Sequence, residues 1–261
     1  MRSLAIINHK CGVGKTATTA NLGHALALQG HRVALVDLDP QAHLTASLGI
    51  FRSPRHGIDR VLLDGAPLLA HAVDTRELLI LVPAGESLAE VETLQGGTER
   101  GLRLQRALQS FADDVDFLIF DCPSSAGLLA ANAVLAVDEV LIPVNPDYLA
   151  LTGVAKQLVT LQRFQPLRTA PLHYRLFLSR TLPRRRLTHA VQDRLLRHFP
   201  RQLLATPVSE SAAVAASAAA GRTLFEYRGH SRSAAEFRAL CDDFLQDRML
   251  IDEQAHSRDV A

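Results

Sequence analysis

Residues 8–17 read Asn-His-Lys-Cys-Gly-Val-Gly-Lys-Thr-Ala, a stretch that follows a short apolar run and opens a long helical pattern. Gly12 and Gly14 stand where side chains would keep backbone N–H groups away from a polyphosphate. Lys15 offers a positive charge to the β and γ phosphates, and the Thr16 hydroxyl can join the coordination shell of Mg²⁺. The stretch predicts a phosphate-binding loop between a strand and a helix, and the alternative is a turn of the same shape without a ligand.

The spacing of two lysines makes this pattern narrower than a general phosphate loop. The general pattern has a glycine where this chain has His9, but Lys10 lies five residues before Lys15. The lysine pair resembles the deviant Walker A motif of the ParA/MinD family of partitioning ATPases, Lys-Gly-Gly-Val-Gly-Lys-Thr-Thr, from which the chain departs at Cys11 and Ala17. The resemblance implies a loop that binds ATP through Lys10, Cys11, Gly12, Val13, Gly14, Lys15, Thr16 and Ala17.

Length and composition indicate a globular chain. Its 261 residues are 48% hydrophobic, which supplies a sizeable core. No repeat, linker or change of composition marks a second domain, so we expect residues 1–261 to form one domain. The N-terminus lacks a charged-then-apolar leader, and no apolar run approaches the roughly 20 residues of a membrane span. The sequence therefore predicts a cytoplasmic protein that does not enter the membrane.

The cysteines argue against several metal and redox classes. Cys11, Cys122 and Cys241 include no Cys-x-x-Cys pair. This spacing disfavours a structural zinc site, an iron–sulfur cluster and a disulfide framework. An iron–sulfur electron-transfer ATPase is disfavoured for the same reason, because its cysteine ligands are missing.

Six apolar runs are typical of buried β-strands, and helical periodicity fills most of the intervals between them. Their apolar character is continuous rather than alternating, as in strands covered on both faces. We therefore predict an α/β fold with a doubly wound, mostly parallel sheet flanked by helices on both faces. Right-handed crossovers bring the strand ends that carry Lys15, Asp37 and Asp121 to one edge of this sheet. The six runs are Leu4–Ile7, Arg32–Val36, Leu78–Val82, Phe117–Phe120, Val140–Val144 and Arg175–Leu178.

A second motif ends the second apolar run. Residues 33–45 read Val-Ala-Leu-Val-Asp-Leu-Asp-Pro-Gln-Ala-His-Leu-Thr, with acidic residues at alternate positions. The segment resembles the Asp-x-Asp-Pro-Gln motif of the family. The resemblance implies that Asp37 orients the metal shell and that Asp39, held by Pro40, faces the attacking water. The alternative is an acidic turn after a buried strand.

A third motif reads Phe-Leu-Ile-Phe-Asp-Cys-Pro-Ser-Ser, four apolar residues that end in Asp121. It has the form of a Walker B strand, whose aspartate holds Mg²⁺ through water. The predicted metal-binding set is therefore Thr16, Asp37 and Asp121. The family usually has a second proline where this chain has Ser124, a difference that affects the following loop without removing the carboxylate.

The resemblance covers nearly the whole chain and implies an ATP-dependent homodimer in which two nucleotide sites face each other. Lys10 of each subunit then reaches the phosphates held by the partner, so that the catalytic set is Lys10, Lys15 and Asp39. The resemblance also implies that hydrolysis is slow, is stimulated by a ParB-like or cargo adaptor protein, and releases the dimer. Residues 145–153 also resemble a family segment near the nucleotide or the dimer interface, and an ordinary start of a helix is the alternative.

Charge is distributed unevenly, although the formal net charge is +1. Residues 160–232 contain 13 basic residues, all arginine, against 3 acidic residues. Residues 1–159 contain 12 against 17, and residues 233–261 contain 3 against 7. Family members bind DNA nonspecifically through basic residues in this part, and a scattered, solvated set of arginines is the alternative. Arg180, Arg184, Arg185 and Arg186 cluster just beyond the strand predicted to end near Ser179, and we expect these four to contact DNA.

One departure concerns this DNA surface. Family members often carry a further arginine in the segment that corresponds to 209–221, which is rich in alanine here and has none. We therefore expect either weaker DNA binding or DNA contact that depends mainly on residues 184–186. The basic segment has no aromatic interleaving or recognition-helix pattern, so binding should not depend on base sequence.

These features predict a nucleoid-associated ATPase that dimerises with ATP, binds DNA nonspecifically and segregates a chromosome or plasmid. A positioning ATPase for a protein cargo, such as a carboxysome or chemoreceptor cluster, is the alternative with the same chemistry. A MinD-like membrane-cycling ATPase needs a basic amphipathic C-terminal helix, whereas the helix predicted in 233–261 is acidic. A metabolic kinase leaves Lys10 unexplained, and a noncatalytic DNA-binding scaffold predicts no ATP turnover.

Overall fold

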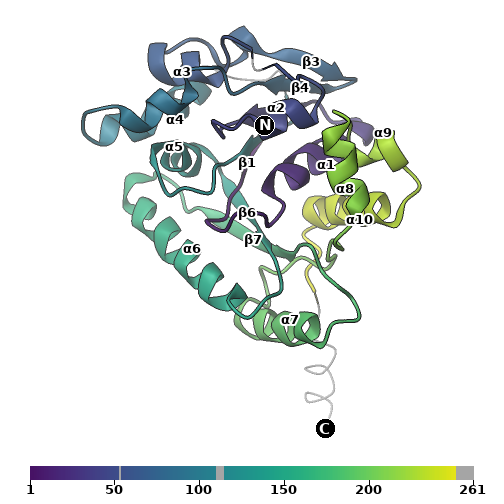
Figure 1. Cartoon of the computed structure of the whole chain (residues 1–261). Helices are drawn as coiled ribbons and strands as arrows, with labels where there is room; N and C mark the ends of the chain where they lie inside the picture. The colour runs from purple at the N-terminus through teal and green to yellow at the C-terminus, as the bar shows by residue number, and fades with distance from the viewer. Residues whose placement is uncertain (53, 110–114, 251–261) are drawn as a thin grey trace.

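The computed structural model describes residues 1–52, 54–109 and 115–250. In these ranges seven strands form one sheet in the order β3-β4-β2-β5-β1-β6-β7 (Figure 1). Neighbouring strands are parallel except for the antiparallel pair β3 and β4. The predicted doubly wound, mostly parallel sheet is thus confirmed. The strands are β1 (Arg2–Ile6), β2 (Val33–Asp37), β3 (Val73–Arg76), β4 (Leu79–Val82), β5 (Phe117–Asp121), β6 (Glu139–Val144) and β7 (His173–Leu178).

Strand β3 is the one strand of the described chain that the apolar runs did not predict. Its sequence, Val-Asp-Thr-Arg, is exposed or half-buried, as suits a short strand at the edge of a sheet. Leu78 has a φ of 57° in the turn that leads into β4, so the strand predicted from Leu78 begins one residue later. Edge strands escape detection because they need no continuous apolar run.

Helices cover both faces of the sheet (Figure 1). On one face lie α1 (Lys15–Leu28), α2 (His43–Ser47), α8 (Ala212–Ala219), α9 (Leu224–Arg228) and α10 (Arg232–Gln246). On the other face lie α3 (Ile58–Asp64), α4 (Arg103–Gln109), α5 (Leu128–Ala136), α6 (Ala150–Phe164) and α7 (Arg186–His198). Short 3-10 turns span Leu68–His71, Leu88–Thr93, Thr98–Leu102 and Gln165–Leu167. Across the described ranges, each helix is too short or too polar to span a bilayer.

The central strands contribute to two cores, one on each face. Along β1, Leu4 and Ile6 pack beneath α1 and α10, whereas Ala5 and Ile7 face the α3–α7 side. Each large aliphatic side chain buried in this way stabilises the fold by about 1.5–3 kcal/mol. Burial on both faces explains why these strands read as continuous apolar runs.

Helix α10 packs one face against the sheet and α1. Phe237, Leu240 and Phe244 are buried, and Asp243 is buried with them, where it accepts the Thr206 N–H at 2.6 Å. The exposed residues Arg232 and Arg238 lie on the outer face.

The acidic helix predicted over 233–261 coincides with α10 as far as Gln246. The prediction is wrong for residues 247–250, because Asp247 has a φ of 54° in the left-handed region and the helix ends there. Residues 251–261 lie outside the described residues.

The strand register places the carboxyl ends of β1, β5 and β2 side by side. Ile6 pairs with Asp121 across β1 and β5, and Asp121 pairs with Asp37 across β5 and β2. The carboxyl ends of parallel strands meet at the edge where α/β sheets bind ligands. The phosphate loop that follows β1 therefore lies next to both carboxylates.

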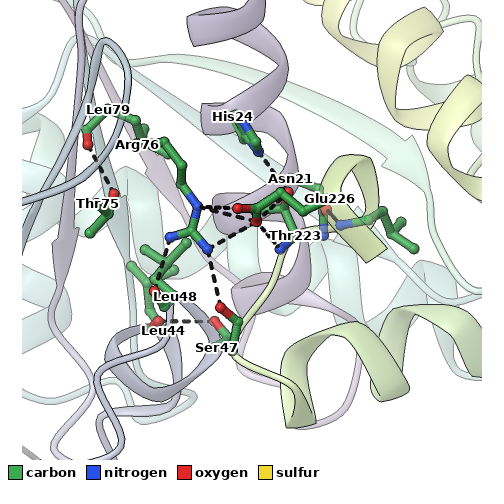
Figure 2. A network of polar contacts seen from close by, with 12 residues as sticks. Asn21, His24, Leu44, Ser47, Leu48, Thr75, Arg76, Leu79, Thr223 and Glu226 are labelled. Carbon is green, nitrogen blue, oxygen red and sulfur yellow. Dashed lines mark hydrogen bonds and ion pairs between the residues drawn. The ribbon is translucent and has the colours of Figure 1, made fainter. Parts of the chain in front are cut away.

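Away from this edge, Arg76 at the end of β3 ties the edge hairpin to two distant segments (Figure 2). Its guanidinium donates to the Leu48 carbonyl after α2 at 2.9 Å and to the Gly221 carbonyl before α9 at 3.1 Å. It also forms an ion pair with Glu226 at 2.9 Å. Arg76 is thus held by three acceptors and fixes the turn between α8 and α9.

The same network reaches helix α1 (Figure 2). Thr223 and Glu226 form a capping box at the start of α9. The Nδ1 atom of His24 lies 2.6 Å from the Thr223 hydroxyl, and the Asn21 side-chain oxygen accepts from the Leu224 N–H at 2.8 Å. These contacts anchor α9 to the helix that follows the phosphate loop.

Candidate nucleotide site

The phosphate loop connects β1 to α1, as the sequence predicts. Gly12 and Gly14 have φ values of 71° and 93°, in the left-handed region that favours glycine. Gly14 is the N-cap of α1, and no side chain caps this end of the helix. The free N–H groups of the first turn and the positive end of the helix dipole make this point suited to an anion.

A cavity of ≈ 1280 Å³ opens in front of the loop. Its walls include residues 11–17 of the loop, Asp39, residues 123–125 after β5, and parts of the segment 208–218. The structure therefore brings the predicted loop residues and Asp39 together around one space. Lys10 does not line this cavity.

Thr16 and Asp121 meet at the floor of the site. The Thr16 hydroxyl donates to Asp121 Oδ2 at 2.7 Å, and the Thr19 hydroxyl donates to Asp121 Oδ1 at 3.2 Å. Asp121 is fully buried behind Thr16. Burial, followed by the neighbouring Asp37 charge, raises the pKa of Asp121 to about 8.

Asp37 is the second fully buried carboxylate at this edge. Its Oδ2 atom accepts from the Thr45 hydroxyl at 2.7 Å and from the Thr45 N–H at 2.8 Å. Burial raises the pKa of Asp37 to about 6, although the hydrogen bonds from Thr45 act in the opposite direction. Neither Asp37 nor Asp121 has a salt-bridge partner within the described residues.

This donor set fits Mg²⁺ and a nucleoside triphosphate. Two buried carboxylates without a cationic partner gain from a nearby cation, and Mg²⁺ is typically held by one or two carboxylates together with phosphate oxygens and water. The Thr16 hydroxyl would bind the ion, and Asp37 and Asp121 would orient its shell. Bound Mg-ATP supplies the γ-phosphoryl group that water attacks. The residues of this chain supply its orientation and the countercharge.

Asp39 occupies a different position from Asp37. It is half-buried, lines the cavity, and accepts the Gln41 N–H at 3.0 Å. Its own N–H donates to Asp37 Oδ1 at 3.2 Å, which fixes the turn after β2. A carboxylate that faces the cavity is placed to orient a water molecule, whereas the buried Asp37 is not. The assignment of water activation to Asp39 remains a prediction.

The two lysines of the loop point to different partners. The Lys15 ammonium is buried and donates to the Ser124 hydroxyl at 2.6 Å. The Lys10 ammonium is half-exposed and forms an ion pair with Asp147, at the start of α6. Sequence reasoning noted Ser124 only as a missing proline and assigned no role to Asp147. Asp147 lies in the segment 145–153, which the sequence already placed near the nucleotide or the dimer interface, and this position was the signal that could have drawn attention to it.

The four arginines predicted to bind DNA fall into two groups. Arg184, Arg185 and Arg186 are exposed at the start of α7, and their side chains form no hydrogen bond or ion pair with the described part of the chain. Arg180 lies instead at the phosphate loop. Its guanidinium donates to the Gly12 carbonyl at 2.6 Å and pairs with Glu210.

Comparison with known proteins agrees with this site. Residues 1–172 match the AAA_31 family, described as an AAA domain. The sporulation initiation inhibitor protein Soj of Bacillus subtilis is 35% identical over 235 residues, which cover 88% of this chain and 93% of Soj. The chromosome-partitioning ATPase Soj of Thermus thermophilus is 34% identical over 252 residues, covering 94% and 96%.

Solved structures share the same architecture. Cobyrinic acid a,c-diamide synthase from Mycobacterium smegmatis, with bound ADP and magnesium, superposes with a TM-score of 0.82 and 31% identity, covering 97% of this chain and 99% of that chain. McdA of Cyanothece in complex with ATP gives a TM-score of 0.82 at 19% identity, with coverage of 97% and 99%, which shows the fold alone. The family match over residues 1–172 and the Soj relatives that span most of this chain lead to one conclusion: the chain belongs to the ParA/MinD family of P-loop ATPases.

Proposed function

We propose that the chain is a DNA-partitioning ATPase that dimerises with ATP, binds DNA nonspecifically as a dimer and is released by hydrolysis. Hydrolysis is slow and is stimulated by a ParB-like adaptor. The printed name of the Thermus thermophilus relative, a chromosome-partitioning ATPase, supports partition as the process. The position of Lys10 carries the proposal, because its half-exposed ammonium lies outside the cavity that its own loop forms. At this exposed position Lys10 can exchange Asp147 for the phosphates of a nucleotide bound by a second subunit.

Dimerisation is tested by sedimentation of the chain with ATP, ADP and no nucleotide. The parent chain is expected to double in mass only with ATP. Lys10→Ala should weaken this dimer while one subunit still binds Mg-ATP, since Lys15 is unchanged. Lys156→Ala is the matched control, because Lys156 is an exposed lysine on α6. Equal mass in all three nucleotide states would contradict the switch.

Water activation is tested at Asp39. Asp39→Ala should leave Mg-ATP binding nearly intact, abolish turnover and trap the dimer, because Asp39 lines the cavity without contacting the phosphate loop in the described structure. Single-turnover measurements separate binding from chemistry. Unchanged hydrolysis by this variant would remove Asp39 from the catalytic set.

DNA binding is proposed for Arg184, Arg185 and Arg186. Three exposed cations at the positive end of α7 repel each other and the helix dipole, and a phosphate backbone would offset that repulsion. Two such sets on one dimer bind DNA more tightly than a single set, so ATP should raise the apparent affinity.

The DNA surface is tested by salt titrations on two unrelated duplexes, with and without ATP. Replacing the three arginines by alanine should weaken binding to both duplexes equally and reduce the salt slope by up to about 2.7, roughly 0.9 for each lost phosphate contact. Replacing three other exposed arginines, Arg52, Arg55 and Arg163, controls for net charge. Preference for one duplex would contradict nonspecific binding.

The cargo distinguishes two versions of this function. A neighbouring gene for a centromere-binding adaptor that stimulates hydrolysis supports partition of a chromosome or plasmid. A neighbouring shell or receptor operon supports the positioning of a protein cargo instead.

A further inference from the structure

Three successive carbonyl groups of the phosphate loop are held by hydrogen bonds. The Arg180 guanidinium donates to the Gly12 carbonyl at 2.6 Å, and the Ser179 hydroxyl donates to the Val13 carbonyl at 2.8 Å. The Gly14 carbonyl accepts from the N–H and the hydroxyl of Thr18, at 2.8 and 2.7 Å. Two of these three anchors come from the segment that follows β7, more than 160 residues along the chain.

Peptide planarity turns these contacts into a statement about the N–H groups. In a trans peptide, the C=O of one residue and the N–H of the next point in opposite directions. Holding the Gly12 carbonyl toward Arg180 therefore turns the Val13 N–H away from Arg180. In the same way, the held Val13 carbonyl sets the direction of the Gly14 N–H, and the held Gly14 carbonyl sets the direction of the Lys15 N–H.

The donors and acceptors of the loop are divided between its two halves. The N–H groups of His9 and Lys10 are used within the protein, by Gln157 and by the Asn8 side chain. From Gly12 to Lys15 the carbonyls are engaged and the N–H groups have no acceptor among the described residues. This second half is therefore suited to bind an anion, because its N–H groups are free to donate and its carbonyl groups are already hydrogen-bonded.

Arg180 is itself held firmly. Its φ of 52° lies in the left-handed region, which a residue with a side chain adopts only where its surroundings hold it there. Ser179 is buried and its N–H donates to the Val144 carbonyl of β6 at 2.9 Å, which fixes the end of β7. The second guanidinium nitrogen of Arg180 pairs with Glu210, whose side chain lines the same cavity.

We propose that Ser179 and Arg180 are positioning residues of the phosphate loop, which orient the Val13 and Gly14 N–H groups toward the phosphates, and that Glu210 holds Arg180 in place. Arg180 thus serves the nucleotide site, in contrast to its expected place on the DNA surface with residues 184–186. The proposal rests on the proposed binding of Mg-ATP.

Binding of two probes separates the possible roles of Arg180. Dissociation constants of Mg-ATP and of Mg-tripolyphosphate, which has no base or ribose, are measured by calorimetry for the parent chain and for each variant. Arg180→Met should weaken both probes about tenfold, because the carbonyl anchor is lost and the loop donors are no longer preset. Arg180→Lys should restore most of the affinity, since an ammonium group still donates to the Gly12 carbonyl.

Two further variants complete the experiment. Glu210→Gln should weaken both probes less than Arg180→Met does, because Arg180 keeps its donor to Gly12 and because the loss of a negative charge from the cavity wall favours an anion. Arg163→Met, at an exposed position near the end of α6, is the matched control and should leave both affinities unchanged. Melting temperatures show whether each variant is folded.

Each alternative result overturns the proposal in a recognisable way. Weaker Mg-ATP with unchanged Mg-tripolyphosphate would assign Arg180 to the nucleoside. Weaker DNA binding with both probes unchanged would return Arg180 to the DNA surface. A parent chain that binds both probes as tightly as Arg180→Met does would remove the positioning role alone. A parent chain that binds neither probe would overturn the proposed function together with this inference.

Discussion

Two clusters of polar groups lie along the same helix, α1, and they differ in how their charges are compensated. Near its middle, Asn21 and His24 belong to the network that also contains Arg76 and Glu226 (Figure 2). In this network the charges of Arg76 and Glu226 neutralise each other. At its N-terminus, Thr16 and Thr19 contact Asp121, which lies beside the equally buried Asp37.

The difference lies in the charge that each cluster leaves uncompensated. The Arg76 network is neutral as folded, so it stabilises the structure without a ligand. The carboxylate pair has no salt bridge within the described residues, and burial raises the pKa of both groups. The Lys15 charge lowers the pKa of Asp121 but does not offset burial and the Asp37 charge, so the pair costs stability when ionised. We therefore interpret it as a binding site for a cation and not as a structural support. The following predictions test this contrast.

The largest effect is expected for Lys15→Ala, which alters binding and leaves the fold intact. Loss of the buried ammonium beside Ser124 should weaken Mg-ATP roughly 100-fold, since charge-assisted hydrogen bonds to phosphate contribute about 1.5–3 kcal/mol each. Calorimetric titration measures the affinity, and Lys156→Ala is the control. A dissociation constant equal to that of the parent would place the nucleotide elsewhere.

Arg76→Ala should show the reverse pattern, with lower stability and normal Mg-ATP binding. It leaves Glu226 and two backbone carbonyls without their donor. Removing one partner of a fully buried pair costs about 3–5 kcal/mol, and because Glu226 is one-third exposed we expect about 2 kcal/mol. Urea unfolding measures the free energy.

The surface pair of Arg106 and Glu99 provides the control for Arg76. Both side chains are more than half exposed, so Arg106→Ala should change the unfolding free energy by less than about 1 kcal/mol. Equal losses in the two variants would show that the Arg76 network is no more than another surface ion pair.

The pH dependence of stability should have opposite signs in the two clusters. Asp37 and Asp121 have raised pKa values, so their stabilising contribution is complete below about pH 4 and is lost as pH rises toward 8. Arg76 lowers the pKa of Glu226 against the opposing effect of burial, so the contribution of Glu226 is present above its ordinary pKa and is lost in acid.

Melting temperatures without metal or nucleotide test these signs. Asp121→Asn should melt above the parent chain at pH 8 and lose this advantage toward pH 5, and each 1 kcal/mol corresponds to about 2–4 °C for a chain of this size. Asp116→Asn is the control, because hydrogen bonding to the Arg32 N–H lowers the pKa of Asp116, so its effect should be constant from pH 8 to pH 5 and diminish only in stronger acid. A pH-independent difference for Asp121→Asn would contradict the buried, uncompensated pair.

The smallest effect concerns thiol labelling. Cys11 is exposed in the phosphate loop, whereas Cys122 and Cys241 are buried and burial raises the pKa of both thiols. Iodoacetamide should therefore label Cys11 alone in the folded protein, and Mg-ATP should slow that labelling severalfold. Cys11→Ser provides the unlabelled control, and labelling that ignores Mg-ATP would separate Cys11 from the site.

Local sequence determined the phosphate loop, six of the seven described strands and the positions of Asp37, Asp39 and Asp121. These features were predictable because each depends on a short stretch, such as glycines that permit a left-handed turn or a continuous apolar run that is buried on both faces. Parallel strand order then brings their ends to one edge.

Tertiary structure decided the contacts between residues far apart in the chain. Arg180 and Arg184 are neighbours in one basic segment, yet Arg180 turns back to the Gly12 carbonyl while Arg184 stays in solvent. Arg76 on the unpredicted edge strand likewise finds Glu226 150 residues away. Counting charges in the sequence does not distinguish an arginine that is ion-paired from one that is free. Which one is free depends on the acceptors that folding brings within hydrogen-bond distance.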